Sequence, residues 1–367
     1  MIDHSLQLNQ KVGQLFFIGI PGPQVDEPTR ELLIEISPGG LCLFSRNIRE
    51  AEQTRHLLDE IRGLLPVTPF LSLDQEGGLV DRLRRIMTPM PAASKLRNTD
   101  DANSLAAIIA ESLRILGFNM DFAPVVDVVD EERAKYSNGL FSRAFGSSKE
   151  DVLKLGGTFL ATLQQNGVIG CLKHCPGLGA SSVDSHEDLP EVDITEDELF
   201  STDLFPYREL LKTAAARAAM IGHAAYPRVN LQETDQNGKL LPSSLSKNFI
   251  NTLLRRELGF DGLVITDDLE MGAIVKNYGI GEACKMAVIA GADMLAICAD
   301  PDAIREGYNA VLRALESGEI VEDRLDVTLN RIAALKRELS APLAFDATRL
   351  QVLSDKIATL NESLSRS

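Results

Sequence analysis

Eight short apolar runs alternate along this chain with longer segments of helical periodicity, and this alternation constrains the fold more than any other feature. The expected strands cover residues 14–20, 40–44, 70–74, 119–126, 168–174, 218–223, 262–266 and 293–297. Between them, residues such as Leu105, Ile109 and Leu113 share one helical face, and further helical segments are expected at 152–163, 248–258 and 283–290. Runs that are apolar on both faces are typical of parallel strands covered by helices. We therefore predict an α/β fold, a single (β/α)₈ barrel of the TIM type, with a doubly wound open sheet as the alternative.

The 367 residues contain no linker rich in Pro, Gly or Ser that would divide them into domains. We assign residues 1–340 to one catalytic barrel. Residues 341–367 are expected to form a polar helical tail that packs on the barrel, with its helix over 348–364.

Polar and charged residues follow the predicted strands where the strands end. They are Asp74, Gln75, Glu76 and Arg82 after the third run, Asp127 after the fourth, Lys173 and His174 at the fifth, His223 at the sixth, and Asp267 and Asp268 at the seventh. In a (β/α)₈ barrel the carboxyl ends of all strands meet at one face, where active sites are built. A lone polar residue at a strand end is usually structural, and Asp127 and His223 are explained equally well in that way. The joint pattern nevertheless predicts a polar site at this face.

The segment KHCPGLGASSVDSHEDLP, residues 173–190, concentrates more reactive side chains than any other part of the chain. It holds two of the five histidines, a cysteine and three carboxylates. It also follows a buried apolar run, and α/β enzymes commonly place their chemistry on loops just beyond strand ends. We expect it to be the catalytic loop, with Gly177 and Gly179 as hinges.

Several of these motifs together resemble the family-3 glycoside hydrolases, specifically the β-N-acetylhexosaminidase branch that includes the peptidoglycan-recycling β-N-acetylglucosaminidase. The matching segments are GGLCLFSRNI, DQEGGLVDRL, FAPVVDV, RAFG from Arg143, KHCPGLG with DSHEDLP, IGHAAYP, VITDDLEMGAI and AGADML. The resemblance implies a single (β/α)₈ barrel that hydrolyses terminal β-linked N-acetylglucosamine with retention of configuration and without a cofactor.

The resemblance also implies the catalytic residues. Asp267 matches the family's nucleophile, which would form a covalent glycosyl intermediate. His186 would be the acid and then the base, with Asp184 orienting its ring, in place of the second carboxylic acid that most glycosidases use. An imidazole titrates near ~6.5 and can therefore give and take a proton near neutral pH. The plainer alternative is that Asp184 and His186 belong to a solvated turn. Asp268 is expected to point away from the site, because adjacent strand residues face opposite sides.

Five further residues resemble the family's substrate contacts. Asp74 and Arg82 match the pair that holds sugar hydroxyls, and Arg143, Lys173 and His174 look like further ligands. A carboxylate and several cations around a polyhydroxylated ring supply directional, charge-assisted hydrogen bonds.

The chain departs from the family pattern in the catalytic loop and in one earlier motif. Many relatives read PGHGD where this chain has residues 176–180, PGLGA, and have Phe at the position of Cys175 and Arg at that of Leu79. Because Asp184 and His186 are retained, these departures bear on loop movement and subsite preference rather than on activity.

Three other functions compete with this one. His174, Cys175, Asp184 and His186 have residue types that suit zinc, but no His-x-His or His-Glu-x-x-His pair lies on a rigid element, so no metal is expected. Within the enzymes, a related β-glucosidase or a phosphorylase that replaces water by phosphate remains an alternative. A non-catalytic barrel that binds muropeptides is the third.

Charge and cysteine usage narrow the choice of partner and compartment. A net charge of −16 repels nucleic acid and anionic lipid, which favours a small carbohydrate or muropeptide substrate. The five cysteines are an odd number without framework spacing, as is typical of reduced thiols in the cytoplasm. The first apolar run, residues 15–20, is far too short to span a bilayer. We therefore expect a soluble, cytoplasmic protein.

Overall fold

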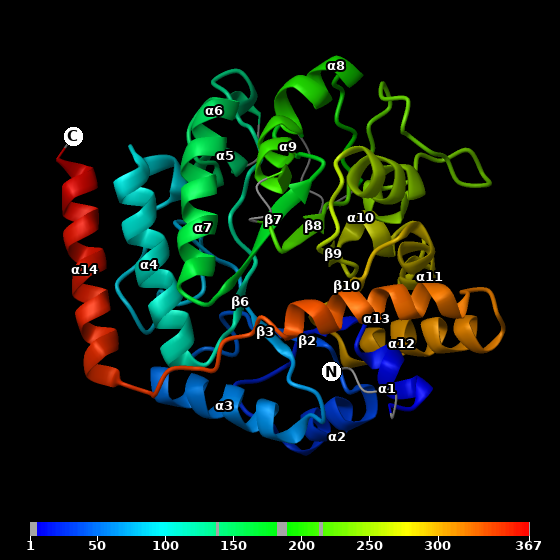
Figure 1. Cartoon of the computed structure of the whole chain (residues 1–367), viewed down its shortest axis with the longest axis horizontal. Helices are drawn as coiled ribbons and strands as arrows, with labels where there is room; N and C mark the ends of the chain where they lie inside the picture. The colour runs from blue at the N-terminus through cyan, green and yellow to red at the C-terminus, as the bar shows by residue number, and fades with distance from the viewer. Residues whose placement is uncertain (1–5, 137–138, 182–188, 213–215, 367) are drawn as a thin grey trace.

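The computed structural model describes residues 6–136, 139–181, 189–212 and 216–366, and its centre is a barrel of parallel strands (Figure 1). Every pair in the eight-stranded sheet runs parallel. Asn119 N donates to Leu71 O at 3.0 Å and Phe122 N to Leu73 O at 2.9 Å, which joins the two edge strands. In sheet order the strands are β3 Phe70–Ser72, β2 Gly40–Cys42, β1 Phe16–Ile18, β10 Met294–Ile297, β9 Leu263–Asp268, β8 Ala218–Ile221, β7 Ile169–Cys175 and β6 Met120–Asp121.

The predicted (β/α)₈ barrel is thus confirmed and the open-sheet alternative is wrong. Each of the eight apolar runs overlaps one of these strands, and β7 and β9 extend one and two residues beyond the predicted runs. The fourth run, 119–126, shortens most in the structure, to Met120–Asp121. Pro124 lies within that run, and a proline has no N–H to donate to a neighbouring strand.

Helices surround the barrel (Figure 1). The predicted helical face of Leu105, Ile109 and Leu113 is fully buried. The longer helices are α2 Glu27–Ile36, α3 Ala51–Leu64, α4 Thr99–Leu116, α7 Gly157–Gln165, α9 Phe205–Lys212, α11 Ile280–Ala290, α12 Pro301–Glu316, α13 Glu322–Lys336 and α14 Ala347–Ser365. The shorter ones are α1 Leu8–Gly13, α5 Leu140–Arg143, α6 Lys149–Asp151, α8 Glu196–Glu198 and α10 Gly272–Val275, with π-helices at Val152–Gly156, Leu199–Asp203 and Asn248–Glu257 and single 3₁₀ turns at Ala93–Lys95, Arg133–Lys135 and Ser243–Leu245.

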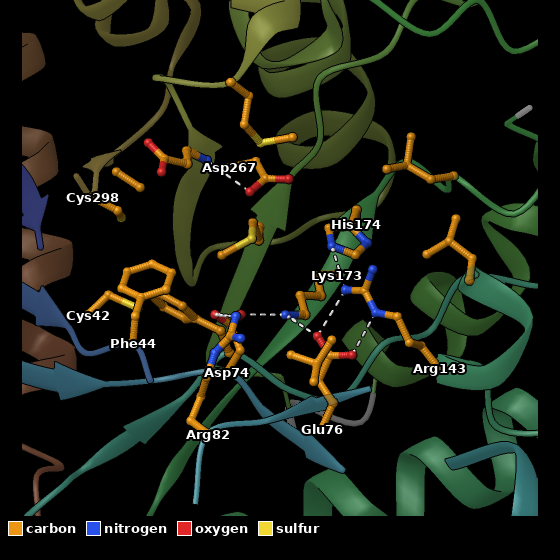
Figure 2. A pocket seen from close by; sticks show the side chains of 18 of the residues that line it. Cys42, Phe44, Asp74, Glu76, Arg82, Arg143, Lys173, His174, Asp267 and Cys298 are labelled. Atoms are coloured by element: carbon orange, nitrogen blue, oxygen red, sulfur yellow. Dashed lines mark hydrogen bonds and ion pairs between the residues drawn. The ribbon is translucent and has the colours of Figure 1, made fainter. Parts of the chain in front are cut away.

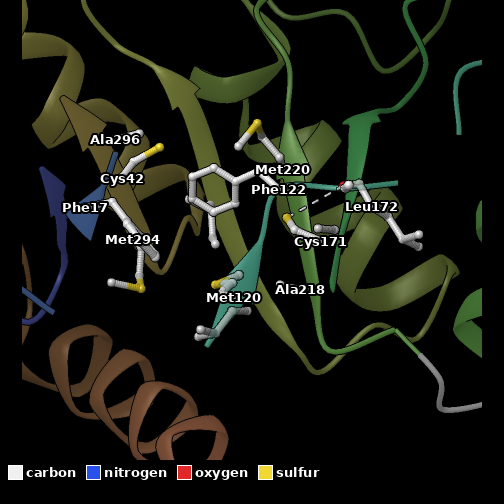
Figure 3. Packing of buried hydrophobic residues seen from close by; sticks show 14 of the residues in the cluster. Phe17, Cys42, Met120, Phe122, Cys171, Leu172, Ala218, Met220, Met294 and Ala296 are labelled. Atoms are coloured by element: carbon white, nitrogen blue, oxygen red, sulfur yellow. Dashed lines mark hydrogen bonds between the residues drawn. The ribbon is translucent and has the colours of Figure 1, made fainter. Parts of the chain in front are cut away.

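Aromatic and sulfur-containing side chains fill the interior of the barrel (Figure 3). The ring of Phe17 stacks on Phe70 with centroids 6.0 Å apart and meets the edge of Phe122 at 5.1 Å. Met120 and Met294 are fully buried beside them. Because this interior is solid, a site for a small molecule must lie at one end of the barrel.

A small antiparallel hairpin, β4 Gln75–Gly77 and β5 Val80–Asp81, follows β3 at the carboxyl end of the barrel. Gly77 and Gly78 turn the chain with φ of 87° and 60°, where L-residues are strained. A Cβ at Gly77 would also lie 2.2 Å from Pro91 O. These two glycines therefore fix how the hairpin presents the charged residues on either side of them.

The C-terminal helix α14 packs along α4 (Figure 1). Arg349 donates to Glu111 through Nε at 2.5 Å and Nη2 at 2.7 Å. Ser354 Oγ accepts Thr88 N at 2.8 Å, which ties the helix to the segment after the hairpin. The helix expected over 348–364 is present, while the division at residue 340 stays a prediction. None of the helices within the described ranges has the length and apolar character needed to cross a membrane.

Candidate active site

A cavity of about 230 Å³ opens at the carboxyl ends of the strands (Figure 2). It brings together six of the eight residues predicted for catalysis or binding, which are Asp74, Arg82, Arg143, Lys173, His174 and Asp267. The other two, Asp184 and His186, lie outside the described residues. The strand-end pattern therefore predicted the location of this cavity.

Lys173 is the centre of a charged wall. Its ammonium donates to Asp74 Oδ1 at 2.7 Å and lies 2.6 Å from Glu76 Oε1, although the side chain is only 2 % exposed. Arg82 Nη2 approaches the other oxygen of Asp74 at 3.3 Å. The carboxylates and cations hold one another in fixed positions, so the wall is preorganised before any ligand arrives.

Glu76 also belongs to this wall, although the sequence marks it only as a polar residue after the third strand and not as a substrate contact. Arg143 binds it in a fork, Nε to Oε2 at 2.7 Å and Nη2 to Oε1 at 2.9 Å. Glu76 lies within the DQEGG motif, but its partner is 67 residues away. Nothing local in the sequence marks that pairing.

These ion pairs shift the pKa values of the charged side chains in the wall. Burial alone would raise the pKa of Asp74 and of Glu76, but the neighbouring cations outweigh it. Lys173 and Arg82 hold the pKa of Asp74 well below its usual range, and Lys173 with Arg143 lowers the pKa of Glu76 to about 2. Burial would lower the pKa of Lys173, but the two carboxylates raise it instead. Asp74, Glu76 and Lys173 are therefore ionised at neutral pH.

His174 stands between the charged wall and the predicted nucleophile. Its Nδ1 lies 2.8 Å from Asp127 Oδ2, and its Nε2 lies 3.5 Å from Arg143 Nη2. Asp127 is fully buried and also accepts the backbone N–H of Leu178 at 2.8 Å. Asp127 thus orients His174 from behind the cavity, which is the structural role that the sequence left open for it.

His223, the other weak candidate, does not line the cavity. Its Nδ1 lies 2.7 Å from Ser244 Oγ and its Nε2 lies 3.0 Å from the backbone oxygen of Asp268. The ring is fully buried. It links β8 to the end of β9 and so supports the strand that carries Asp267.

Asp267 lies at the end of β9 and faces the cavity (Figure 2). Burial would raise the pKa of its carboxyl, but His174, His223 and the N–H of Asp268 lower it. That N–H donates to Asp267 Oδ1 at 2.8 Å. The side chain is therefore an anion at neutral pH, held by its own strand and open to the cavity.

The expectation that Asp268 points away from the site is wrong, because Asp268 also lines the cavity. The cause is an irregularity in β9. Met294 pairs with Ile265 and Ala296 with Asp268, so three steps along β9 match two along β10. A bulge of this kind interrupts the alternation of side chains and re-aims them. Burial, with Glu270 and Asp267 nearby, raises the pKa of Asp268 to about 7.

The start of the catalytic loop is tightly packed, and the hinge role expected for its two glycines stays a prediction. A Cβ at Gly177 would lie 2.7 Å from Asp203 Cβ, and one at Gly179 would lie 1.9 Å from Val128 O. Tyr226 also donates its hydroxyl to Gly177 O at 2.9 Å. In the part of the loop that the structure describes, the glycines allow close approach between segments.

The residues that depart from the family pattern differ in how deeply they are buried. Leu178 is 6 % exposed and lines the cavity, so this position contributes an apolar residue to the cavity wall. Cys175 is fully buried and does not line the cavity. Leu79, at the tip of the hairpin, is 69 % exposed. Within the described ranges, no three His, Cys, Asp or Glu side chains are grouped so as to hold a metal ion.

Comparisons with a family model, with known proteins and with solved structures all relate this chain to the same family of enzymes. The model of the glycosyl hydrolase family 3 N-terminal domain matches residues 7–335. A β-hexosaminidase of Tolumonas auensis is 32 % identical over 305 residues, which cover 82 % of this chain and 86 % of that protein. One of Psychromonas ingrahamii is 30 % identical over 334 residues, 89 % of this chain and 93 % of that protein. A family 3 β-N-acetylglucosaminidase from a Paenibacillus species has a solved structure that superposes with a TM-score of 0.85 at 35 % identity, covering 97 % of this chain and 69 % of that one.

Proposed function

Because the chain belongs to glycosyl hydrolase family 3 and is a glycoside hydrolase, we propose that it is a retaining exo-β-N-acetylglucosaminidase. Its substrates are cell-wall muropeptides that carry a terminal β-linked N-acetylglucosamine, and it acts in the cytoplasm. The names of the relatives support the activity on N-acetylhexosaminides. The five buried, unpaired thiols fit a reducing compartment.

The observation that carries the proposal is the state of Asp267. A retaining glycosidase needs an ionised carboxylate on one side of the anomeric carbon. Asp267 is ionised at neutral pH, is fixed by the N–H of Asp268 and faces the cavity. Attack by this carboxylate would give the covalent glycosyl intermediate.

The charged wall would bind the sugar opposite this nucleophile. Asp74 can accept hydrogen bonds from sugar hydroxyls, and Arg82 can donate them. Arg143, Lys173 and His174 extend the same surface. Because the salt bridges hold these side chains rigid, little conformational entropy remains to be lost when a sugar binds.

The acid/base part of the mechanism is proposed for His186 with Asp184. The imidazole would protonate the departing oxygen and then deprotonate the water that releases the sugar. Asp184 would orient the ring and stabilise its cationic form. Neither residue lies in the described part of the chain, so this step rests on the sequence motif.

The paired charges favour hydrolysis over phosphorolysis. The described cations of the wall, Arg82, Lys173 and Arg143, are each bonded to Asp74 or Glu76. An incoming phosphate would therefore have to compete with carboxylates that are already in place. A water molecule is uncharged, so it can enter without displacing these carboxylates from their cations.

A substrate panel tests the function. The purified protein is given the p-nitrophenyl β-glycosides of N-acetylglucosamine and of glucose, each with and without inorganic phosphate, and a muropeptide with terminal N-acetylglucosamine. We expect turnover of the N-acetylglucosaminide and the muropeptide, unchanged by phosphate. Faster turnover of the glucoside would identify a β-glucosidase, dependence on phosphate a phosphorylase, and tight binding without turnover a muropeptide-binding protein.

A further inference from the structure

The aromatic ring of Phe44 lies beside the charged wall at the open end of the barrel. Phe44 follows β2 and lines the same cavity as Asp267. The guanidinium of Arg82 lies over this ring, with Cζ 5.4 Å from the centroid. Both side chains lie on the side of the cavity away from Arg143 (Figure 2). Neither the proposed sugar contacts nor the proposed reaction uses the ring.

Hydrogen bonds hold the guanidinium of Arg82 at a single point, although its backbone N–H is anchored to Gln75 Oε1 at 3.0 Å. Its Nη2 meets Asp74 Oδ2 at 3.3 Å, and its buried Nε has no partner in the part of the chain that the structure describes. Arg143, by contrast, binds Glu76 through two nitrogens at 2.7 and 2.9 Å. A planar group that is bonded through one atom can turn about that contact, whereas a two-point contact fixes its plane. A further contact is therefore needed to orient Arg82.

The ring of Phe44 supplies such a contact. The face of an aromatic ring attracts a guanidinium and stacks against its plane. The attraction strengthens where water is excluded, and the side chain of Arg82 is only 25 % exposed. Asp74 thus fixes where the end of the arginine lies, and the ring restricts how its plane is turned.

Phe44 is itself held in place by its neighbours. Its backbone N–H donates to Asn47 Oδ1 at 2.9 Å, and the fully buried Asn47 donates in turn to Ile20 O at 2.9 Å. Arg46 also lies over the ring, with Cζ 4.7 Å from the centroid. The guanidinium of Arg46 donates to the carbonyl oxygens of Ile20 and Cys298. The ring is therefore a fixed platform and not a side chain that can follow the movements of an arginine.

We propose that Phe44 is a positioning residue of the glycosidase, whose ring holds the Arg82 guanidinium in the orientation that binds a sugar hydroxyl. Without the ring, Arg82 would keep its bond to Asp74 but would sample several orientations. Binding a sugar would then have to restrict them, which weakens binding. Because Arg82 would contact the sugar equally in the ground and transition states, the loss falls on KM and not on kcat. The inference rests on the proposed function, since it requires a sugar bound at Arg82.

Removal of the ring, with an apolar side chain kept in its place, tests this role. Phe44→Leu should raise KM for the aryl N-acetylglucosaminide about 3- to 30-fold with little change in kcat. Phe44→Tyr keeps the aromatic face and should stay within about twofold of the wild type. Phe345→Leu makes the same change at another partly exposed phenylalanine, outside the cavity, and should leave both constants unchanged. Thermal unfolding verifies that each variant is folded, and Phe44→Met takes the place of Phe44→Leu if that variant is not.

A double-mutant cycle with Arg82→Gln separates positioning from a general structural role. If the ring acts through Arg82, Phe44→Leu should not raise KM further once the arginine is replaced. An unchanged KM in Phe44→Leu alone, or an equal rise with and without Arg82, would overturn the proposal. The cycle is measured on whichever glycoside of the substrate panel the wild type hydrolyses, or by calorimetry of muropeptide binding if it hydrolyses none. The positioning role and the activity on N-acetylglucosaminides can therefore fail separately.

Discussion

Asp267 and Asp268 are adjacent carboxylates in one cavity, and the protein gives them opposite proton affinities. Asp267 receives a backbone hydrogen bond and has imidazoles beside it, which lower its pKa. Asp268 is buried next to other carboxylates, and its pKa rises to about 7. At neutral pH the first is an anion and the second is partly protonated. Only the first is suited to attack an anomeric carbon.

Replacing each aspartate in turn should separate their roles. Asp267→Ala should lower kcat for the aryl N-acetylglucosaminide by at least about 10³-fold, because the variant has no nucleophile. Asp268→Ala should cost far less. Steady-state kinetics of both variants, with circular dichroism to verify folding, provides the measurement. If Asp268→Ala is the inactive variant, the assignment of the nucleophile must be exchanged.

His186→Ala should show a loss that depends on the leaving group. Poor leaving groups need a proton as the bond breaks, whereas p-nitrophenolate leaves without one. We therefore expect turnover of muropeptide or of a methyl glycoside to fall by about 10²-fold or more, and turnover of the p-nitrophenyl substrate to fall less. Asp184→Asn should show the same trend more weakly. Equal losses across the series would argue against the acid/base role.

The hairpin β4–β5 is the element that turns a strand end into a binding wall. It carries Glu76 and Arg82 past the end of β3, and Asp121 Oδ1 fixes its start by accepting Gln75 N at 2.9 Å. The side chains from the hairpin then meet Lys173 of β7 and Arg143 of α5. The wall is assembled from three elements that are distant in the sequence.

Glu76→Gln should destabilise the protein in a pH-dependent way. Breaking a buried charge pair costs about 3–5 kcal/mol, so the free energy of unfolding at pH 7 should fall by roughly that amount. The pKa of Glu76 is about 2 in the folded state against an ordinary 4.5, so the unfolded chain takes up the proton first as pH falls. The stabilisation is therefore complete above pH 4.5 and is lost as pH falls toward about 2.

Urea unfolding at several pH values measures this effect. The difference between wild type and Glu76→Gln should narrow steadily below pH 4.5. Glu52→Gln, which changes an exposed carboxyl on α3, is the matched control and should change little at any pH. A difference that stays constant through the acid range would show that the charge of Glu76 does not stabilise the fold.

The helix α14 supports the same hairpin from outside. Ser354 bonds Thr88, and nearby Met90 donates to Asp81 Oδ2 at 2.9 Å while its carbonyl accepts Gly78 N at 3.0 Å. The tail is therefore connected through one short segment to the hairpin that carries Arg82. It lies beyond residue 335, where the family match ends.

Ser354→Ala should weaken both stability and substrate binding. The variant leaves the partly buried Thr88 N without its partner, so the loss should lie toward the lower end of the about 1–3 kcal/mol that a buried unsatisfied donor costs. If the hairpin shifts, KM should rise with little change in kcat, because Arg82 would bind the sugar equally in the ground and transition states. Thr359→Ala, on the exposed side of the same helix, should behave as wild type. Loss of stability with unchanged KM would limit α14 to a structural role.

At the scale of the whole molecule, the two ends of the barrel have different chemistry. The carboxyl end is open and charged. Toward the other end, Lys336 of α13 donates to Gln14 Oε1 at 2.8 Å and lies over the ring of Phe70 at 5.3 Å from its centroid. Burial lowers the pKa of Lys336 to about 7.

Because of Lys336, the free energy of unfolding should increase as the pH rises above about 7. Its ordinary pKa is 10.5, so between about 7 and 10.5 the unfolded chain binds a proton that the folded chain does not. The free energy of unfolding should therefore rise with pH across this window, and Lys336→Met should remove that rise. Denaturant unfolding at pH 7, 8.5 and 10 tests it, with Lys285→Met on the partly exposed surface of α11 as the control. A rise that persists in Lys336→Met would assign it to another group.

The architecture could be predicted because its signals are local. Each strand is a short run of apolar residues and each long helix repeats its apolar positions, so the eight units and the barrel follow from patterns within about 20 residues. The carboxyl ends of parallel strands must share one face, and this rule alone predicts that Asp74, Lys173, His174 and Asp267 lie together.

The pairings within the cavity were beyond the sequence, because each depends on contacts between distant segments. Glu76 meets Arg143 only through the closure of the barrel. Asp268 faces the cavity because β9 slips against β10, and no alternation rule contains that slip. The sequence by itself determined that Asp74, Lys173, His174 and Asp267 gather at the open end of the barrel. Only the tertiary structure decided which of them are bonded to one another and which are ionised, since both depend on distances and burial that arise when the strands close.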